Sequence, residues 1–227
     1  MGSAAHEHHR PICFDCPAAR RDALMDLVGD SRESCRLVCR AVEAREPLPG
    51  SWGRSSWFGL VRRGIVLRQH TDRRGHVTAV DAAGPGCLLP LRSTEAPQGF
   101  AVSRLLVCLG AEAPLGRWIE EQPQVGVDLL RLQREAMERV ERYAAARTRS
   151  AAKSRLAAVL CILQDTLSPS RKLTAIPSDL QQRDLAALLG MRHETVCRVL
   201  GQFEREGLVR KGPEGLEILD RAALEQV

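Results

Sequence analysis

The chain lacks the features of a membrane or secreted protein. No apolar run approaches the roughly 20 residues that cross a bilayer. The polar, His-rich start MGSAAHEHHR has no apolar centre of the signal-peptide type. We therefore expect a cytoplasmic protein without a membrane partner, in which thiols stay reduced. The sequence also has no readable Ser/His/Asp or Cys/His catalytic motif and no phosphate-cradling glycine loop, so we expect no enzyme.

What the chain does have is length, a mild positive charge and cysteine. Its 227 residues are enough for two compact units. Lys and Arg number 33 against 28 Asp and Glu, a formal charge of +5, which permits a polyanionic partner without requiring one. In a reducing compartment the eight cysteines favour metal ligands, sensors or small core residues over disulfides. They are Cys13, Cys16, Cys35, Cys39, Cys87, Cys108, Cys161 and Cys197.

The first segment, residues 1–49, is predicted to be an arm followed by a helix. Residues 17–46 look helical, and Asp30 or Ser31 is placed to cap a helix that runs to about Arg45. Apolar residues recur near its end at helical spacing, and Pro47 stops it.

Residues 50–122 have the sequence pattern of a small antiparallel β-roll. Gly53, Gly64, Gly75 and Gly86 fall at intervals of eleven, and short β-prone runs such as IVLRQHT and HVTAV lie between them. Short strands at this spacing, joined by glycine turns, predict a roll or barrel.

Residues 123–149 are predicted to form one long helix. Apolar side chains step along it at an average of 3.6 residues from Val125 onward. A narrow stripe on an otherwise charged helix is typical of a two-helix seam, either with a second chain or with the roll. We take it as a dimerisation seam made by Leu129, Leu132, Ala136, Val140 and Tyr143. The alternative is that the stripe packs only on its own domain.

Residues 150–227 carry the pattern of a DNA-binding domain. In RDLAALLGMRHETVCRVLGQF, one short helix, a turn at Gly190 and a second helix follow the helix-turn-helix plan. LVRKGPEGLEIL then predicts a two-stranded wing. The overall expectation is an α+β chain: roll, long helix, and winged helix-turn-helix.

The outward face of the second helix is the predicted reader of base edges. Glu194, Cys197 and Arg198 share this face, where Arg can bond guanine and Glu can accept from cytosine. The wing would place two cations near phosphates. The full predicted DNA-binding set is Arg192, His193, Glu194, Cys197, Arg198, Arg210 and Lys211. The competing interpretation is a small helical domain with solvated charges.

These residues closely resemble the DNA-binding end of the Crp/Fnr family of bacterial transcription regulators. The recognition helix of that family often reads Glu-Thr-Val/Ile-Ser/Gly-Arg, and HETVCR matches it with Cys197 in the Ser/Gly position. The resemblance covers most of the chain. It implies a cyclic-nucleotide-binding-like roll, a homodimer, a palindromic double-stranded DNA site and RNA polymerase as a partner.

The resemblance also bears on which small molecule the roll would sense. Family members that bind cyclic AMP carry a Gly-Glu-Leu cassette followed by an Arg-Ala pair. Here GPGCLLPLRSTEAPQG has Cys87 in place of that Glu and no Arg-Ala pair. The sequence therefore argues against a cyclic nucleotide.

The Fnr branch of the family implies a different cofactor, a [4Fe–4S] cluster held by three N-terminal cysteines and one just after the roll. Cys13 and Cys16 match the opening pair, and Cys108 in AVSRLLVCLG matches the distant ligand. No cysteine occupies the familiar third position, so Cys39, or Cys35 in its place, is the expected substitute. The resemblance thus implies sensing of oxygen, nitric oxide or redox state.

Other roles for the cysteines stay open. Cys13, Cys16, Cys35 and Cys39 would also suit tetrahedral zinc. Cys13 and Cys16 could form a reversible disulfide, and haem bound by His or Cys is a further possibility. Cys161 is expected in the core, and Cys87 and Cys197 are expected to be bystanders.

Overall fold

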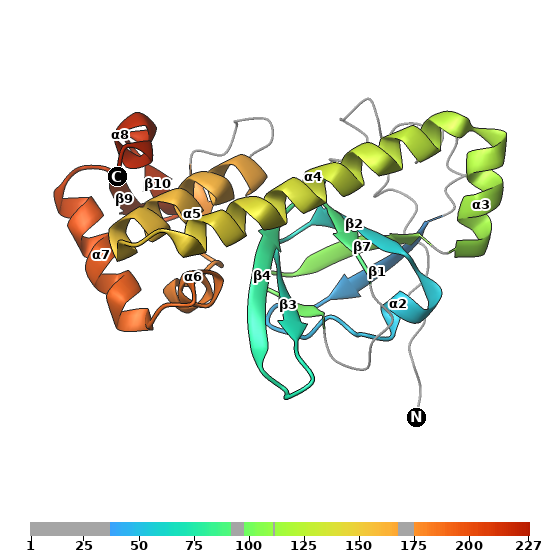
Figure 1. Ribbon diagram of the computed structural model, residues 1–227, viewed down its shortest axis with the longest axis horizontal. Helices are drawn as coiled ribbons and strands as arrows, with labels where there is room; N and C mark the ends of the chain where they lie inside the picture. Colours follow the sequence, from blue (N-terminus) through green and yellow to red (C-terminus); the bar gives the residue numbers. More distant parts are fainter. Residues whose placement is uncertain (1–36, 92–97, 111, 168–174) are drawn as a thin grey trace.

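A computed structural model describes residues 37–91, 98–110, 112–167 and 175–227. The chain forms a β-roll, a long helix that crosses it, and a helical C-terminal domain with a small sheet (Figure 1). This is the α+β architecture expected from the sequence. None of the helices in the described ranges is long and apolar enough to span a bilayer.

The roll consists of two antiparallel sheets. One has the order β1-β7-β2-β5 and the other β4-β3-β6. A single-turn helix, α2 (Trp52–Ser55), precedes β2. The strands are β1 (Val38–Val42), β2 (Phe58–Arg63), β3 (Val66–Thr71), β4 (Val77–Ala83), β5 (Leu88–Pro90), β6 (Gly99–Ala101) and β7 (Leu105–Gly110).

The glycine spacing has a conformational cause. Gly64, Gly75 and Gly86 have φ values of 85°, 82° and 83°, the left-handed region that side chains rarely adopt. At Gly64 a Cβ atom would also lie 2.3 Å from the carbonyl oxygen of Arg104. Three of the four regularly spaced glycines therefore make turns that suit glycine, as the sequence predicted.

The helix predicted to run to about Arg45 is wrong in the described part of the chain. Residues 38–42 form strand β1, which pairs antiparallel with β7. Short apolar runs fit a helix or a strand about equally well, and Val38 and Val42 are β-branched residues that favour strands. The free edge of β7 decides between the two. Residues 1–36, which include the predicted start of this helix, lie outside the described residues.

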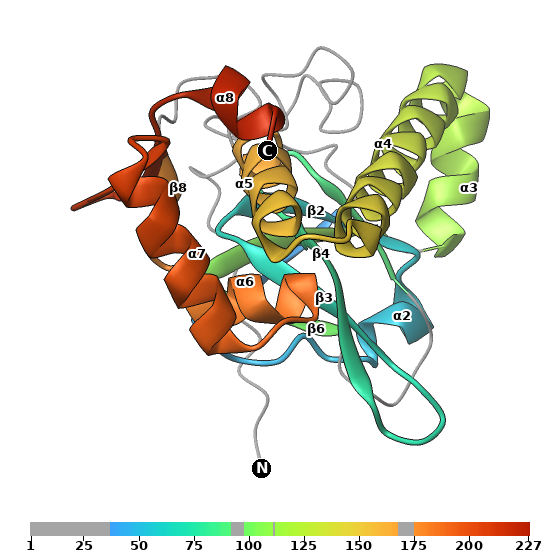
Figure 2. The same cartoon turned by 60° about the vertical axis from the view of Figure 1, so that its left-hand side comes forward.

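The long helix is α4 (Pro123–Thr148), preceded by α3 (Glu112–Glu121) and followed by α5 (Ala152–Leu167). α4 lies across the roll and reaches the C-terminal domain, where α5 runs back beside it (Figures 1 and 2). A buried ion-pair network joins α4 to the roll. Asp81 of β4 is fully buried and accepts from Arg139 Nε at 2.7 Å and from Arg68 Nε at 2.6 Å.

The C-terminal domain continues with β8 (Ala175–Pro177), α6 (Gln182–Leu189), α7 (His193–Arg205), β9 (Val209–Gly212), β10 (Gly215–Ile218) and α8 (Arg221–Glu225). The three strands form one antiparallel sheet in the order β8-β10-β9. Leu156, Leu160 and Leu163 of α5 are fully buried in the same apolar core as Val196 and Phe203 of α7.

Candidate DNA-binding surface and cysteine pair

Helices α6 and α7 form a helix-turn-helix with defined ends. At the start of α6, Asp184 and Gln181 make a reciprocal capping box. Gly190 ends the helix at φ 59°, ψ 38°, the left-handed conformation that favours glycine. Arg192 then begins α7 in an extended conformation. The tight turn places α7 against α6 with Val196, Val199, Leu200 and Phe203 buried.

The outward face of α7 carries the predicted base-contacting residues. Arg192, His193, Glu194 and Arg198 are exposed near its N-terminal end. α7 lies on the outer side of the domain, with α6 between it and the roll (Figure 2). Cys197 is half-buried, and its thiol donates to Gln182 Oε1 of α6 at 2.7 Å. Cys197 therefore contributes partly to the packing of the two helices.

The wing cations are exposed but already have acidic partners. Arg210 Nη2 lies 2.6 Å from a carboxylate oxygen of Glu217, and Lys211 Nζ lies 3.1 Å from one of Glu204. A phosphate would have to compete with these carboxylates. Exposed ion pairs contribute only about 0–1 kcal/mol, so the competition is not prohibitive.

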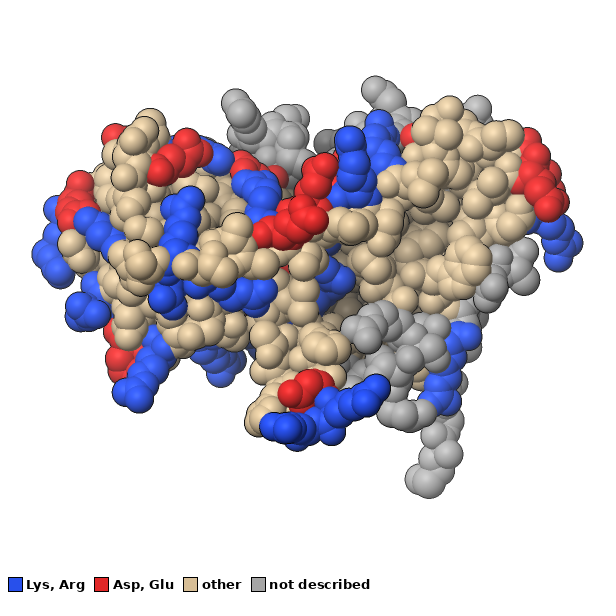
Figure 3. Space-filling view, in the orientation of Figure 1, with Lys and Arg blue, Asp and Glu red and all other residues tan. Residues whose placement is uncertain are grey.

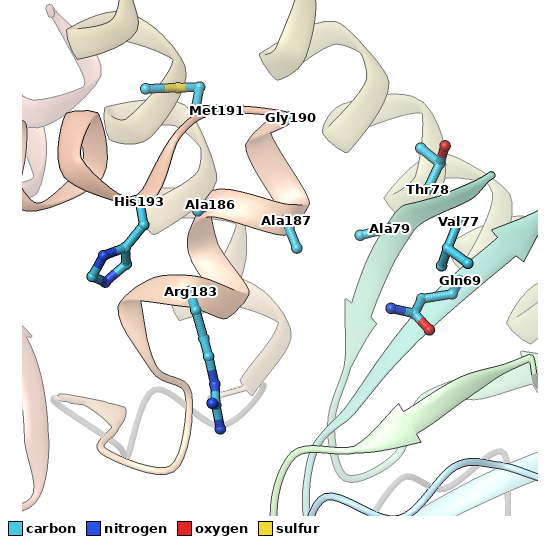
Figure 4. A pocket seen from close by; sticks show the side chains of 10 residues that line it. All are labelled: Gln69, Val77, Thr78, Ala79, Arg183, Ala186, Ala187, Gly190, Met191 and His193. Atoms are coloured by element: carbon cyan, nitrogen blue, oxygen red, sulfur yellow. The ribbon is translucent and has the colours of Figure 1, made fainter.

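Arg183 was not predicted from the sequence. It is exposed on α6 and lines, with His193, a cleft of about 470 Å³ between α6 and the roll strands β3 and β4 (Figure 4). Gln69 and Val77 lie on the roll side of this cleft. The helix-turn-helix motif did not single out Arg183, because this cleft forms only where the C-terminal domain meets the roll.

The C-terminal segment carries charges of both signs, with 11 Lys and Arg against 10 Asp and Glu in residues 150–227. In the view of Figure 3, Lys and Arg side chains lie over this end of the molecule together with Asp and Glu side chains. On helix α7, Arg198 and Arg205 lie outside the buried face. Exposed cations such as these are the side chains that can contact phosphates, and phosphate contacts supply most non-specific affinity for DNA.

The second feature is a pair of cysteines in the roll. Cys39 on β1 lies directly opposite Cys108 on β7 in the sheet register, and their Sγ atoms are 3.1 Å apart. Cys39 is exposed and Cys108 is buried, with 6% of its surface accessible. The sequence placed both in the expected metal site, although it assigned Cys39 to a helix. Their contact is a product of strand pairing.

The surroundings of the pair combine one cation and an apolar floor. Arg62, itself buried, donates from Nη1 to Cys39 Sγ at 3.5 Å. Cys108 belongs to an apolar cluster that also includes side chains of β2 and β5 and Leu132 and Ala136 of α4. The pair therefore lies at the boundary between the solvent and the apolar cluster that the roll shares with α4. Cys13, Cys16 and Cys35, the other expected ligands, lie outside the described residues.

Comparisons with known proteins agree with the helix-turn-helix geometry of the C-terminal domain. Residues 154–227 match the Crp-like helix-turn-helix domain. The transcriptional activator protein FnrL of Cereibacter sphaeroides is 25% identical over 224 residues, 93% of this chain and 90% of that protein. Residues 154–227 thus form a Crp-like helix-turn-helix domain, and the chain as a whole is similar to Crp/Fnr-type regulators.

Other Crp/Fnr relatives match less of the chain or only its fold. The nitrogen fixation regulation protein FixK of Bradyrhizobium diazoefficiens is 29% identical over 126 residues, 55% of this chain and about half (53%) of that protein. FixK2 from Bradyrhizobium japonicum has a TM-score of 0.68 at 19% identity, covering 84% of this chain and 96% of its own. CooA from Carboxydothermus hydrogenoformans, solved as a mutant, has a TM-score of 0.67 at 15% identity, with coverages of 90% and 94%. Crp/Fnr proteins are transcription regulators rather than enzymes, in line with the expectation from the sequence.

The stripe expected to form the dimer seam is largely buried within the chain itself. Leu132, Ala136 and Tyr143 are 2%, 1% and 0% exposed, because they pack on the roll and on α5. Leu129 and Val140 are half-buried. The side chains that α4 presents to solvent are instead Val127, Leu130 and Met137, which are 57%, 72% and 56% exposed.

Proposed function

We propose that this Crp/Fnr-type chain is a homodimeric transcription regulator that senses oxygen, nitric oxide or redox state through a [4Fe–4S] cluster. The proposed ligands are Cys13, Cys16, Cys39 and Cys108. The observation that carries the proposal is the contact between Cys39 and Cys108, 69 residues apart in sequence, with Sγ atoms at 3.1 Å. It places side by side the two thiols that the sequence could join only by resemblance.

The donor set fits the chemistry of such a cluster. Iron–sulfur clusters are held by cysteine thiolates, whose surroundings tune their potential. Within the described ranges no group of three or more His, Cys, Asp or Glu side chains could hold a metal ion. The site would therefore be completed by Cys13 and Cys16 from the N-terminal arm, with Cys35 as the substitute if Cys39 does not serve.

The residues around the pair suit a thiolate site beneath the long helix. The guanidinium of Arg62 offsets part of the negative charge that several thiolates bring together. Phe58, Leu60 and Leu88 cover the buried side of Cys108 and exclude water there. When bound, a cluster of this kind supplies a centre that reacts with oxygen, nitric oxide and other oxidants. A change at the site would reach α4 through the apolar cluster that Cys108 shares with Leu132 and Ala136.

The DNA-binding half of the proposal rests on α7 and α4. Arg198 and Glu194 of α7 would contact base edges in the major groove. The exposed apolar residues Val127, Leu130 and Met137 of α4 would form the seam with a second copy. Two recognition helices about 34 Å apart would then fit a palindromic site in double-stranded DNA. RNA polymerase is the further partner that a regulator of this type would engage.

Cysteine variants reconstituted without oxygen test the cofactor. We expect Cys39→Ala and Cys108→Ala each to lose most of the bound iron and sulfide, because each removes one of four thiolates. The matched control is Cys161→Ala, a buried thiol in α5 that takes no part in the pair and should keep the cluster. The measurement is iron, sulfide and zinc content together with the absorption spectrum.

The same experiment separates the rival cofactors. A zinc site made of Cys13, Cys16, Cys35 and Cys39 would lose metal in Cys39→Ala but retain it in Cys108→Ala, and the protein would be colourless. A haem protein would show a Soret band and no acid-labile sulfide. Wild-type iron and sulfide in Cys108→Ala would refute our ligand assignment.

A further inference from the structure

Cys39 and Cys108 meet the geometric conditions for a disulfide with each other. Directly opposed residues of an antiparallel pair have Cα atoms about 4.5–5.5 Å apart. Disulfides need a Cα separation of about 4.4–6.8 Å. The register Cys39↔Cys108 satisfies this requirement by backbone pairing alone. The Sγ atoms, at 3.1 Å, are already in contact.

The two thiols differ in access to solvent. Cys39 is exposed on β1, an edge strand of its sheet. Cys108 is buried on the neighbouring strand β7. An accessible thiol next to a second, shielded thiol is the arrangement found in redox-sensing cysteines, where one sulfur meets the oxidant and the other resolves the product.

We propose that, in the metal-free protein, Cys39 and Cys108 are a peroxide-oxidised pair that closes into a cross-strand disulfide. Cys39 Sγ attacks one oxygen of hydrogen peroxide, the O–O bond breaks, and sulfenic acid and water form. Cys108 Sγ then attacks Cys39 Sγ, the S–O bond breaks, and the hydroxide leaves as water with the proton of Cys108. In sum, two thiols give two electrons and two protons to the peroxide, and one disulfide and two waters result.

The bond would have two consequences in this fold. It would tie the edge strand β1 covalently to β7, whose Cys108 shares an apolar cluster with Leu132 and Ala136 of α4. It would also remove two thiols from metal binding until they are reduced. The pair is thus a redox site in its own right, whichever metal the reduced thiols hold.

Peptide mapping tests the proposal directly, because trypsin separates the two cysteines. Cleavage after Arg and Lys releases Cys39 in residues 37–40 and Cys108 in residues 105–117, each peptide with a single cysteine. Reduced protein is stripped of metal with a chelator, and its iron and zinc contents are measured. It is then treated with stoichiometric hydrogen peroxide, and free thiols are blocked with N-ethylmaleimide. We expect the two peptides to be recovered mainly as one cross-linked species that dithiothreitol separates.

Variants identify the order of the steps. In Cys108→Ser the reaction should stop at the sulfenic acid of Cys39, which dimedone traps. In Cys39→Ser, residues 105–117 should be recovered as the maleimide adduct. Cys161→Ser should form the cross-link as the wild type does. Because Cys39 is exposed, its replacement leaves the core unchanged, and failure to fold cannot explain its result.

Either of two results would overturn the proposal. One is recovery of both peptides as maleimide adducts after peroxide treatment. The other is a cross-link from residues 37–40 to the N-terminal peptide that carries Cys13 and Cys16. Neither result depends on iron, because the assay uses metal-free protein. A chain that never binds a cluster can still pass this test, and a cluster-binding chain can fail it.

Discussion

At the scale of single residues, the proposed DNA contacts involve side chains that differ in whether they already have a partner within the chain. Arg198 and Glu194 are exposed on α7 and are available to DNA, whereas Cys197 shares a hydrogen bond with Gln182 of α6. Arg210 and Lys211 are exposed but paired with Glu217 and Glu204. We therefore assign base recognition mainly to α7 and a weaker, sequence-independent role to the wing.

This assignment predicts different defects for two arginine variants. Arg198→Ala should reduce the preference for specific over scrambled DNA, because a base contact discriminates by about 1–3 kcal/mol per half-site. Arg210→Ala, the control, should lower affinity for both DNAs by a similar factor, since a phosphate contact carries no base information. Gel shifts at several salt concentrations measure both. An unchanged preference in Arg198→Ala would contradict the role of this side chain.

At the scale of elements, α4 has one buried face and one exposed face. One packs on the roll through Leu132, Ala136 and the buried Arg139–Asp81 pair. The opposite face exposes Val127, Leu130 and Met137. Large apolar side chains gathered on one exposed helix face are typical of an interaction site. The predicted helix is present, and its most exposed apolar side chains differ from the stripe that the sequence singled out.

The exposed face predicts which substitutions produce monomers. Leu130→Glu or Met137→Glu should dissociate the dimer, because the two-fold axis would place like charges opposite each other across an apolar seam. Leu132→Glu is a poor test, since it would bury a charge within one subunit and unfold it. Light scattering across a range of protein concentrations gives the oligomeric state.

The control for this experiment is Arg131→Glu, which changes an exposed side chain on the flank of the same helix. It should leave the oligomeric state unchanged. A dimer that survives Leu130→Glu would show that α4 meets its partner through other residues, or that the subunits associate elsewhere.

At the scale of the whole molecule, one side chain links the roll to the DNA-binding domain. Arg45 follows β1 with a positive φ of 69°, and its Nη1 donates to both carboxylate oxygens of Asp184 at 2.9 Å. Its Nη2 donates to the carbonyl of Asp179, and its guanidinium lies 5.8 Å from the ring centre of Phe100. Because Asp184 also caps α6, Arg45 holds the first turn of the helix-turn-helix against the roll.

Removal of this link should loosen the two domains without unfolding either. Arg45→Ala leaves Asp184 with fewer donors, and we expect a loss of about 1–2 kcal/mol in stability at the domain contact. Hydrogen exchange should rise in α6 and in residues around Arg45, while α5 and the core of α7 stay protected. Arg45→Lys should restore part of the protection, because it keeps the charge without the forked geometry. Equal exchange in wild type and Arg45→Ala would refute the link.

The sequence alone determined the turns and helices, because these depend on residues that lie close together along the chain. Gly64, Gly75, Gly86 and Gly190 occupy left-handed backbone positions, which is why the roll's turns and the helix-turn-helix were readable from spacing alone. The long helix was readable from its 3.6-residue period. The Crp/Fnr motif HETVCR was readable because its residues lie within two turns of one helix.

Tertiary structure decided what depends on pairing between distant segments. Residues 38–42 are compatible with helix or strand, and the unpaired edge of β7 made them β1. The same pairing placed Cys39 against Cys108. The apolar residues of α4 lie on two faces of the helix. Leu132 and Ala136 are buried because they face the apolar core of the roll, whereas Leu130 faces the solvent. A one-dimensional pattern shows that a helix has apolar faces, but only the packed fold shows which face is already covered.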